Sequence, residues 1–353
     1  MAEGDIAQAL ADQVRDAAER GQPLKLIGLN SKSFYGHAVE GEPLQLSGHS
    51  GILRYEPTEL VLSARAGTPI PEIEAALAEN GQMLTFEPPG FDHTASLGGA
   101  IASGLGGPRR PWGGAPRDQL LGMTLLDGRG RILHFGGEVM KNVAGYDLSR
   151  LMAGALGTLG ALLEVSIKVL PAPTVERSLV LELSHERALH KMRELARQPA
   201  PLSAACHLDD RLHLRLSGNS ASVAAWEKQI GGDAGDGEDF WQRLRNHRLR
   251  FFQSERPLWR LSLPPATPRL DCEHQVLTDW AGSQRWVYTS SGAVDIREEV
   301  AKVGGHAILF RHGDGKIPVF HPLDSVRERL HRGLKKTFDP EGILNPGRQY
   351  ASI

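Results

Sequence analysis

The chain has one stretch, residues 95–104, with almost no side-chain bulk, and this bareness suits a ligand that lies directly on the backbone. It reads Ala-Ser-Leu-Gly-Gly-Ala-Ile-Ala-Ser-Gly. Glycine amides and the hydroxyls of Ser96 and Ser103 are donors for an anion, and Leu97 and Ile101 are placed to anchor the segment from below. We therefore expect a loop that binds a phosphate ester. A plain turn or close helix packing is the alternative interpretation of the same glycines.

A second small, polar segment follows the apolar run at 24–27, which has the pattern of a short buried strand. It reads Gly28-Leu29-Asn30-Ser31-Lys32-Ser33. Successive backbone amides after a strand form an anion-binding nest, so we expect a second phosphate contact here. Lys32 has two possible roles. Its charge either adds to the attraction of the backbone amides for the phosphate, or it is a solvated cation on the loop.

Composition narrows the classes of protein that this chain can belong to. Its 353 residues suffice for two domains, and its formal net charge of -2 gives no electrostatic case for nucleic acid or an anionic membrane. Cys206 and Cys272 are far apart, which supports neither a disulfide framework nor a metal or iron-sulfur cluster. The first residues lack the basic start and apolar run of a signal peptide, and we expect a cytoplasmic protein with no metal.

Apolar periodicity and turn residues predict a mixture of helices and strands. The expected elements are a helix from Ile6 to Gly21, strands at 24–27, 44–46, 52–55 and 60–66, a helix between Thr68 and Gly81, a hairpin of 120–126 with 131–135, a short helix at 146–152 and a strand at 162–170. Pro171-Ala172-Pro173 ends the last strand. We place the boundary there, which gives domains 1–171 and 172–353.

The second half differs in composition from the first. Glycine becomes sparser, and five of the six tryptophans fall between Trp226 and Trp286. We interpret these aromatic residues as the core of the second domain, with a docking surface as the alternative. The run at 231–237 reads Gly-Gly-Asp-Ala-Gly-Asp-Gly, and we expect a flexible acidic loop there.

Four segments, taken in order, resemble the FAD-binding domain of the vanillyl-alcohol oxidase type, also called the PCMH-type flavin domain. They are residues 28–33, 88–99, 112–122 and 154–165. The resemblance implies an α+β fold, with a two-subdomain FAD-binding domain followed by a smaller α+β domain of the FAD-linked oxidase C-terminal type. It also implies that the C-terminal tail returns toward the flavin domain. No Gly-x-Gly-x-x-Gly follows the first strand, which argues against a nicotinamide Rossmann enzyme.

Carried over segment by segment, the resemblance implies a set of FAD-binding residues. These are Gly28, Leu29, Asn30, Ser31, Lys32, Ser33, Pro89, Gly90, Ala95, Ser96, Leu97, Gly98, Gly99, Ser103, Gly113, Asp118, Gly160, Glu164 and Val165. Relatives that attach flavin covalently often use a histidine in the first loop, and none lies between Gly28 and Ser33. We therefore expect non-covalent FAD.

Two further segments resemble one branch of that family, the FAD-binding subunits of glycolate oxidases. They are Lys-Asn-Val-Ala-Gly-Tyr-Asp-Leu at 141–148 and Phe-Asp-Pro-Glu-Gly-Ile-Leu-Asn-Pro-Gly-Arg at 338–348. The resemblance implies an FAD-dependent oxidoreductase that acts with a larger flavin subunit and an iron-sulfur subunit to oxidise glycolate, a 2-hydroxy acid, to glyoxylate. It implies attachment to the inner membrane only through these partners.

The catalytic residues are harder to assign than the cofactor loops. Oxidation of a 2-hydroxy acid needs a base for the hydroxyl and a cation for the carboxylate. The candidates are His306, His312 and Asn345. Each has a structural alternative: His306 as an ordinary residue at the start of a strand, His312 as part of a Gly-Asp-Gly turn, and Asn345 as part of a turn in the tail. Arg109, Arg110 and Arg117 are candidate cations, with a solvated loop as the alternative for the first two. Asn142 and Tyr146 fit either the flavin face or a helix cap. A stand-alone FAD oxidoreductase and a non-catalytic assembly subunit remain the competing functions.

Overall fold

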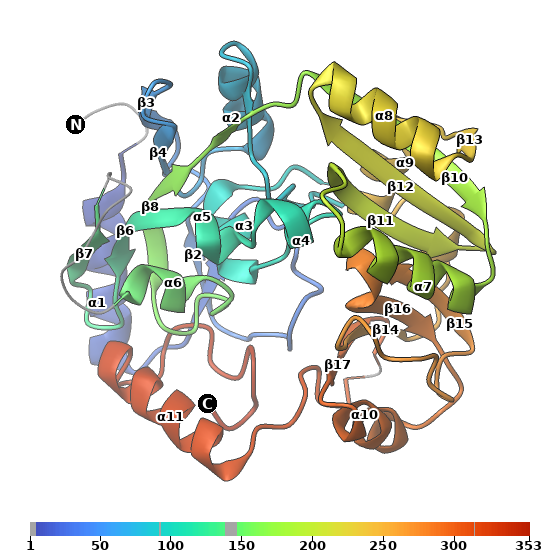
Figure 1. The fold of residues 1–353 in the computed structure, drawn as a ribbon. Helices are drawn as coiled ribbons and strands as arrows, with labels where there is room; N and C mark the ends of the chain where they lie inside the picture. Colours follow the sequence, from blue (N-terminus) through green and yellow to red (C-terminus); the bar gives the residue numbers. More distant parts are fainter. Residues whose placement is uncertain (1–4, 92, 138–146, 314) are drawn as a thin grey trace. The chain divides into compact units, whose positions relative to one another are not determined.

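The computed structural model describes residues 5–91, 93–137, 147–313 and 315–353 and divides into two compact units (Figure 1). Unit 1 comprises Met1–Gly106, Gly114–Ala172 and Pro322–Ile353, and unit 2 comprises Gly107–Gly113 and Pro173–His321. This division differs from a single cut at 171/172 in two segments. Residues 107–113 belong with unit 2, and the C-terminal tail belongs with unit 1. Both units mix helices with antiparallel sheet, so the expected α+β class is confirmed.

Unit 1 contains two layers of apolar packing around its main sheet. Its elements are α1 (Ala7–Arg20), β1 (Leu24–Ile27), β2 (Glu42–Gln45), β3 (Ile52–Glu56), β4 (Val61–Arg65), α2 (Ile70–Ala78), β5 (Gln82–Met83), α3 (Leu97–Ser103), α5 (Pro116–Gln119), β6 (Leu120–Leu126), β7 (Ile132–Gly136), α6 (Leu148–Met152), β8 (Ala161–Lys168), β9 (Leu170–Pro171) and α11 (Ser325–Phe338). The main sheet has the order β3-β4-β8-β6-β7, and β1 pairs in parallel with β2.

Alternation along β8 explains how the main sheet of unit 1 is covered on both faces. Leu162 packs in the cluster that contains the apolar residues of α2 and α3, and Leu163 packs in the cluster that contains those of α1. Successive side chains of a strand point to opposite faces, so one strand contributes to both cores. The hairpin of β6 and β7 turns at Asp127, as the Asp-Gly sequence predicts.

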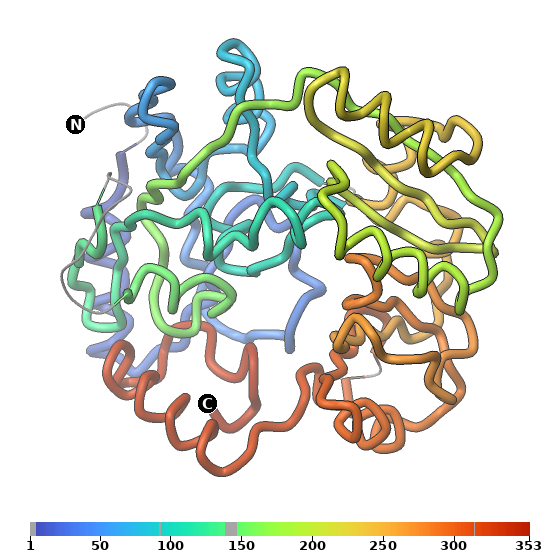
Figure 2. Tube along the Cα trace, in the orientation of Figure 1, coloured from blue at the N-terminus to red at the C-terminus, as the bar shows by residue number. Residues whose placement is uncertain are grey.

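The C-terminal segment completes unit 1 by joining its N-terminal strand. Leu344 forms a parallel bridge to Leu24, and the Leu24 amide donates to the Ile343 carbonyl at 2.7 Å. Figure 2 shows the red end of the trace returning to the part of the unit that contains the blue N-terminal segments. The first strand is therefore held by residues more than 300 positions away.

Unit 2 is built on one eight-stranded sheet of order β13-β10-β12-β11-β15-β16-β14-β17. Its elements are α4 (Arg110–Gly113), β10 (Val175–Glu182), α7 (His185–Ala196), β11 (Leu202–Leu208), β12 (Arg211–Gly218), α8 (Ser220–Ile230), β13 (Asp233–Ala234), α9 (Glu238–Arg245), η1 (Arg250–Phe252), β14 (Leu258–Ser262), β15 (Gln275–Asp279), η2 (Trp280–Gly282), β16 (Gln284–Tyr288), α10 (Ala293–Lys302) and β17 (His306–Arg311). Along β12, Leu212, Leu214 and Leu216 pack in one cluster with the apolar residues of α7. His213 stacks on Phe240 of α9 instead.

The tryptophans of the second half lie mainly inside unit 2, which confirms their interpretation as core. Trp241, Trp259 and Trp286 are at most 5% exposed. Trp226 packs at the edge of the α7 cluster, and the Trp280 Nε1 donates to the Gly107 carbonyl. The expectation of a flexible loop at 231–237 is wrong in part, because Asp233–Ala234 pairs with β10 as β13.

No helix in the described part of the chain is both long enough and apolar enough to cross a lipid bilayer.

Buried histidines in unit 2 predict that the protein loses stability in mild acid. Burial, aided by Arg285, lowers the pKa of His185 from 6.5 to about 4, and burial also lowers the pKa of His207. The unfolded chain then binds more protons than the folded chain below pH 6.5, so stability falls as the pH falls. For His185 alone this amounts to about 3 kcal/mol between pH 7 and pH 4.

The pH effect is checked by urea unfolding at several pH values. His185→Gln, which removes the titrating ring, should flatten the profile, whereas the same change at exposed His190 should leave it as it is. If His185→Gln leaves the pH dependence of the unfolding free energy unchanged, protonation of His185 is not a cause of the loss of stability in acid.

Candidate functional site

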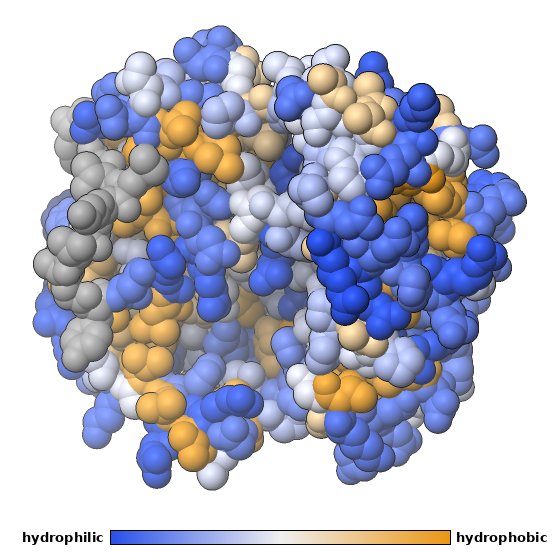
Figure 3. All heavy atoms as spheres, in the orientation of Figure 1, coloured by the Kyte–Doolittle hydropathy of each residue, from blue (hydrophilic) through white to orange (hydrophobic). Residues whose placement is uncertain are grey.

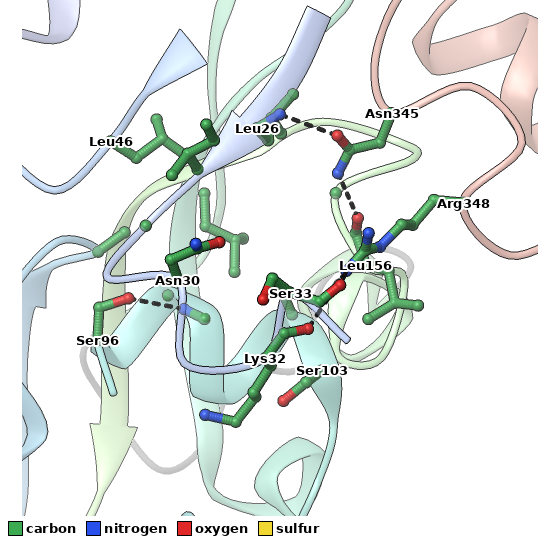
Figure 4. A pocket seen from close by; sticks show the side chains of 18 of the residues that line it. Leu26, Asn30, Lys32, Ser33, Leu46, Ser96, Ser103, Leu156, Asn345 and Arg348 are labelled. Carbon is green, nitrogen blue, oxygen red and sulfur yellow. Dashed lines mark hydrogen bonds between the residues drawn. The ribbon is translucent and has the colours of Figure 1, made fainter. Parts of the chain in front are cut away.

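Unit 1 holds a large cavity between its first loop, helix α3, the 152–162 segment and the C-terminal tail (Figure 4). The empty space in and around it is about 1210 Å³, a figure that includes open solvent at its mouth. The lining residues are Lys25, Leu26, Ile27, Gly28, Leu29, Asn30, Ser31, Lys32, Ser33, Ala38, Val39, Leu46, Ala66, Ser96, Gly98, Gly99, Ala102, Ser103, Met152, Ala155, Leu156, Gly157, Gly160, Leu162, Asn345 and Arg348.

The first loop leaves β1 and bends sharply along the cavity wall. Gly28 passes so close to Ser96 that a Cβ on it would lie 2.8 Å from the Ser96 Oγ. Asn30 has a left-handed backbone with φ of 62°, and its carbonyl accepts from the Ser33 amide at 3.3 Å. A turn of this kind directs main-chain amides to one side, as an anion-binding nest requires.

The bare segment around residue 100 is a helix, so the expectation of a loop is wrong. Helix α3 (Leu97–Ser103) begins at Ser96, whose Oγ accepts from the Gly99 amide, and ends at Gly104 in a left-handed conformation. The predicted anchors Leu97 and Ile101 are fully buried, which confirms their role. The Ser103 hydroxyl donates to the Ala100 carbonyl at 3.1 Å. Glycine has low helix propensity, and here the serine cap and the buried face stabilise the helix instead.

The two glycines of α3 differ in what surrounds them, which gives a matched pair of substitutions. A Cβ on Gly98 would lie 2.6 Å from the Ala66 Cβ and 3.0 Å from its carbonyl oxygen, whereas one on Gly99 would meet only the Ser96 Oγ, at 3.1 Å. We expect Gly98→Ala to destabilise the protein by about 1–3 kcal/mol through overpacking. Gly99→Ala should preserve stability, because alanine favours the helix, but weaken FAD binding if the ligand lies on that backbone.

Urea unfolding and FAD titration of both variants measure these effects. Equal stability losses in the two variants would show that packing, and not ligand approach, determines the glycine at position 99.

Asn345 fastens the C-terminal tail to the cavity wall at two points. Its Oδ1 accepts from the Leu26 amide at 2.9 Å, and its Nδ2 donates to the Leu156 carbonyl at 2.7 Å (Figure 4). A Cβ on the neighbouring Gly157 would collide with the Asn345 Nδ2 and with Leu26. Both ends of the amide are therefore bound to backbone, which gives this residue a positioning role.

Arg348 holds the far end of the first loop through its backbone carbonyls. Its guanidinium donates to the carbonyls of Lys32, Ser33 and His37 at 3.3, 3.0 and 2.9 Å. Its own carbonyl accepts from the His37 amide at 2.9 Å. Burial and the Arg348 charge lower the pKa of His37, so this imidazole is neutral at pH 7. The tail thus fixes the shape of the loop that begins the cavity.

The charges on the cavity wall suit a ligand with several negative charges. Lys25, Lys32 and Arg348 are cations, and none of the described lining residues is an aspartate or a glutamate. The Lys32 Nζ lies 3.1 Å from the Ser31 Oγ and 5.9 Å from the ring centroid of Phe91. Lys32 lines the cavity, as its role as a supplement to the nest requires, and a contact with the cofactor stays a prediction. These features fit the diphosphate of FAD, and the apolar Met152 and Leu156 fit a flat ring.

The structure brings together about half of the predicted FAD-binding residues. Those that line the cavity are Gly28, Leu29, Asn30, Ser31, Lys32, Ser33, Ser96, Gly98, Gly99, Ser103 and Gly160. The others lie outside its lining: Pro89, Gly90, Ala95, Leu97, Gly113, Asp118, Glu164 and Val165. Leu97 and Val165 are buried in the core, and Gly113 belongs to unit 2. The Asp118 Oδ2 accepts from the Ala115 amide, and Glu164 accepts from Thr124.

The catalytic candidates other than Asn345 lie in unit 2. His306 is exposed at the start of β17, where the structural interpretation places it. The His312 Nδ1 lies 3.4 Å from the Glu255 carboxylate, and its backbone is left-handed. None of the described residues that line the cavity is a histidine.

The predicted arginines have three different environments. Arg109 is 7% exposed and forms an ion pair with Glu176, so its interpretation as a solvated loop residue is wrong. Arg110 stacks over the ring of Trp280 at 4.5 Å, and Arg117 is exposed. Asn142 and Tyr146 lie outside the described residues.

Sequence reasoning did not assign Arg348 to the site. It placed the 154–165 segment there through the family resemblance, but it did not name Ala155, Leu156 or Gly157 as FAD-binding residues. The tail motif ending in Arg348 was visible, but its prolines and glycines predicted only turns. One signal could have distinguished a binding role from a plain turn. Arg348 is a cation directly after Pro-Gly, in a tail that the family resemblance predicts to lie beside the flavin domain.

Comparison with known proteins places this geometry in a family. A family model described as an FAD binding domain matches residues 5–136. The glycolate oxidase subunit GlcE of Escherichia coli strain K12 is 46% identical over 353 residues, which is all of both chains. The chain belongs to the GlcE family. The resemblance found in the sequence is thereby confirmed, as is FAD as the cofactor of an FAD-dependent oxidoreductase.

More distant similarities extend beyond the GlcE family. The glycolate oxidase subunit GlcD of Bacillus subtilis strain 168 is 31% identical over 129 residues, which are 36% of this chain and 27% of that protein. A D-lactate dehydrogenase of Anaerostipes hadrus is 32% identical over 184 residues, or 51% of this chain and 38% of that protein. A solved alkyldihydroxyacetonephosphate synthase shares the fold, with a TM-score of 0.67 at 14% identity over 96% of this chain and 75% of that one.

Non-covalent attachment of FAD stays a prediction. No described lining residue is a histidine or a cysteine, although His37 lies just past the first loop. Acid precipitation should release all of the yellow colour into the supernatant. Flavin that remains with the pellet would contradict this prediction.

Proposed function

We propose that this chain is the FAD-binding subunit of a glycolate oxidase complex that converts glycolate, a 2-hydroxy acid, to glyoxylate. Its partners in this proposal are a larger flavin subunit and an iron-sulfur subunit, and any attachment to the inner membrane runs through them. The full-length identity to the Escherichia coli subunit supports the assignment. The PCMH-type fold and the division into domains around it belong to the same proposal.

The proposal that this chain binds FAD is supported above all by the cavity wall of unit 1. It combines main-chain amides, serine hydroxyls and three cations without a described carboxylate. An amide-rich wall offsets the charge of a diphosphate without a dedicated metal ion. FAD, when bound, accepts the electrons of the alcohol oxidation.

The residues of the chain then have defined tasks around that cofactor. The first loop would present its amides and the hydroxyls of Ser31 and Ser33 to the phosphates, whereas the first amides of α3 already donate to acceptors within the protein. Asn345 and Arg348 position that loop and the Leu156 segment through backbone contacts. The apolar wall near Met152 excludes water. These tasks bind and orient the cofactor, and they leave proton abstraction to a group outside the described lining.

The decisive experiment is the visible spectrum of the purified chain, first alone and then with glycolate under anaerobic conditions. A flavin band that bleaches on addition of glycolate would show a complete hydroxy-acid site in this subunit. A band that persists, but bleaches when the partner subunits are added, would assign the substrate oxidation to a partner and electron transfer to this chain.

Two results would contradict the proposal. Absence of a flavin band after reconstitution with FAD would favour a non-catalytic assembly subunit. Turnover of glycolate by the chain alone, at the same rate with and without its partners, would favour a stand-alone oxidoreductase.

A further inference from the structure

Helix α11 carries an exposed apolar stripe on the surface of unit 1. Val326 is 53% exposed and Leu330 is 59% exposed, and the two lie one turn apart on the same side of the helix. Gly333 continues the stripe with open space around it, because a Cβ there would meet no atom within 4 Å. Val326 and Leu330 are therefore neighbouring exposed apolar side chains on an otherwise polar helix.

The same helix contributes to the core through its other side. Phe338 is 7% exposed in the main cluster of unit 1, and Leu334 packs against that cluster. The stripe is therefore not the face by which α11 is held to its own unit. In Figure 3, hydrophobic side chains gather over α6 and α11, and Leu148 and Leu151 of α6 are only partly buried.

Two cations lie along one side of the stripe and have no acidic partner among the described residues. Arg329 and Lys336 are both exposed and both lie beside the stripe at helical spacing. Elsewhere on the helix, Arg327 lies 3.5 Å from Asp324 and Arg332 lies 2.7 Å from Glu328. The surface made of Val326, Arg329, Leu330, Gly333 and Lys336, called here the α11 face, is thus apolar along its middle and positively charged along one edge.

We propose that the α11 face docks a partner subunit whose contact surface is apolar at its centre and acidic along one side. This inference rests on the proposed function, because it assumes that the chain works in a complex. Protein interfaces place apolar contacts at the centre and polar groups at the rim, and the α11 face has an apolar middle with a charged edge. Charge complementarity then selects an acidic surface, since the helix is strongly basic within a chain of net charge -2.

A lipid surface fits the α11 face less well than a protein does. Helices that lie in a membrane interface bury a broad apolar side rich in tryptophan, phenylalanine and leucine. The α11 face has only two large apolar side chains, neither of them aromatic. A chain of net negative charge is also not drawn to anionic lipid as a whole.

The test is co-purification of the full-length FAD-loaded chain with the affinity-tagged larger flavin subunit and the iron-sulfur subunit of the same complex. Leu330→Glu should lower the amount retained at least tenfold, the scale of a central contact. The double reversal Arg329→Glu with Lys336→Glu should also lower retention, most strongly at low salt. Val294→Glu is the matched control, because Val294 is 66% exposed on α10 of unit 2 and should not matter.

Each outcome bears on the proposal in a defined way. If Leu330→Glu has normal FAD content and melting temperature and is retained like the parent chain, the docking face is overturned while the proposed function stands. A parent chain that retains neither subunit overturns both. Flotation of the parent chain with phosphatidylglycerol vesicles, lost in Leu330→Glu, would overturn the protein partner in favour of lipid. If Leu330→Glu does not fold, the charge-reversed variant decides the question by the same readout.

Discussion

Replacing Arg348 with methionine is expected to weaken FAD binding by about 10- to 100-fold while the protein stays folded. The guanidinium donates to three carbonyls of the first loop, at residues 32, 33 and 37. A hydrogen bond to a charged group contributes about 1.5–3 kcal/mol, so losing part of this set releases the loop from the shape that its amides need. Because Arg348 also lines the cavity, the change removes one positive charge from its wall. Titration of the apoprotein with FAD, followed by flavin fluorescence, measures the effect.

Two further variants separate loop positioning from charge. Arg348→Lys keeps the charge but not the planar guanidinium that reaches several carbonyls, so we expect it to restore only part of the affinity. Arg332→Met removes an exposed arginine that pairs with Glu328 on α11, and it should not alter FAD binding. If Arg348→Lys binds FAD as tightly as the parent, charge alone explains the residue and the positioning role is wrong.

Local patterns in the sequence predicted most of the elements that surround the cavity. The helix at 7–20, the strand at 24–27 and the hairpin of β6 with β7 follow from apolar spacing and turn residues, which act over a few positions. The first loop was found for the same reason, since small residues directly after a strand are a local signal. These predictions succeed because apolar spacing and turn residues determine the local structure from within each segment.

Other parts of the site could not be predicted from local sequence patterns, because contacts with distant residues determine their structure. Helix α3 forms from a glycine-rich segment with poor helix propensity, since it is stabilised by its buried face and by the Ser96 cap. The Asn345 amide binds the Leu26 backbone across 319 positions. Such a contact leaves no trace in local periodicity, and only the family resemblance indicated that the tail returns to the flavin domain.

This long-range closure gives the first loop an unusual dependence on the C-terminal segment. Its shape is fixed because its carbonyls accept from Arg348 and because β1 is held by Asn345 and Leu344. A ligand that contacts mainly amides needs those amides fixed before it arrives, since ordering them on binding costs affinity. We therefore expect substitutions in the tail to act on FAD binding without touching FAD.

Breaking the buried ion pair at the end of α11 should have the largest effect on stability of any single change described above. The Lys335 Nζ lies 2.7 Å from the Asp339 Oδ2 and also donates to the carbonyls of Thr158 and Leu344. The Asp339 carboxylate accepts from the amides of Ile343 and Leu344. Its side chain is fully buried and that of Lys335 is 10% exposed. Removing one partner leaves an uncompensated buried charge, so we expect Asp339→Asn or Lys335→Met to cost about 3–5 kcal/mol.

A double-mutant cycle distinguishes this pair from ordinary surface pairing, because α11 offers a control at the same spacing. Arg332 and Glu328 are also four residues apart, yet both are largely exposed, and such pairs contribute about 0.3–0.5 kcal/mol. The Lys335 and Asp339 double variant should recover part of the sum of its single losses, since neither buried charge is then left without a partner. A coupling energy no larger than that of the surface pair would mean that the backbone contacts, and not the opposite charges, hold the tail against the cavity.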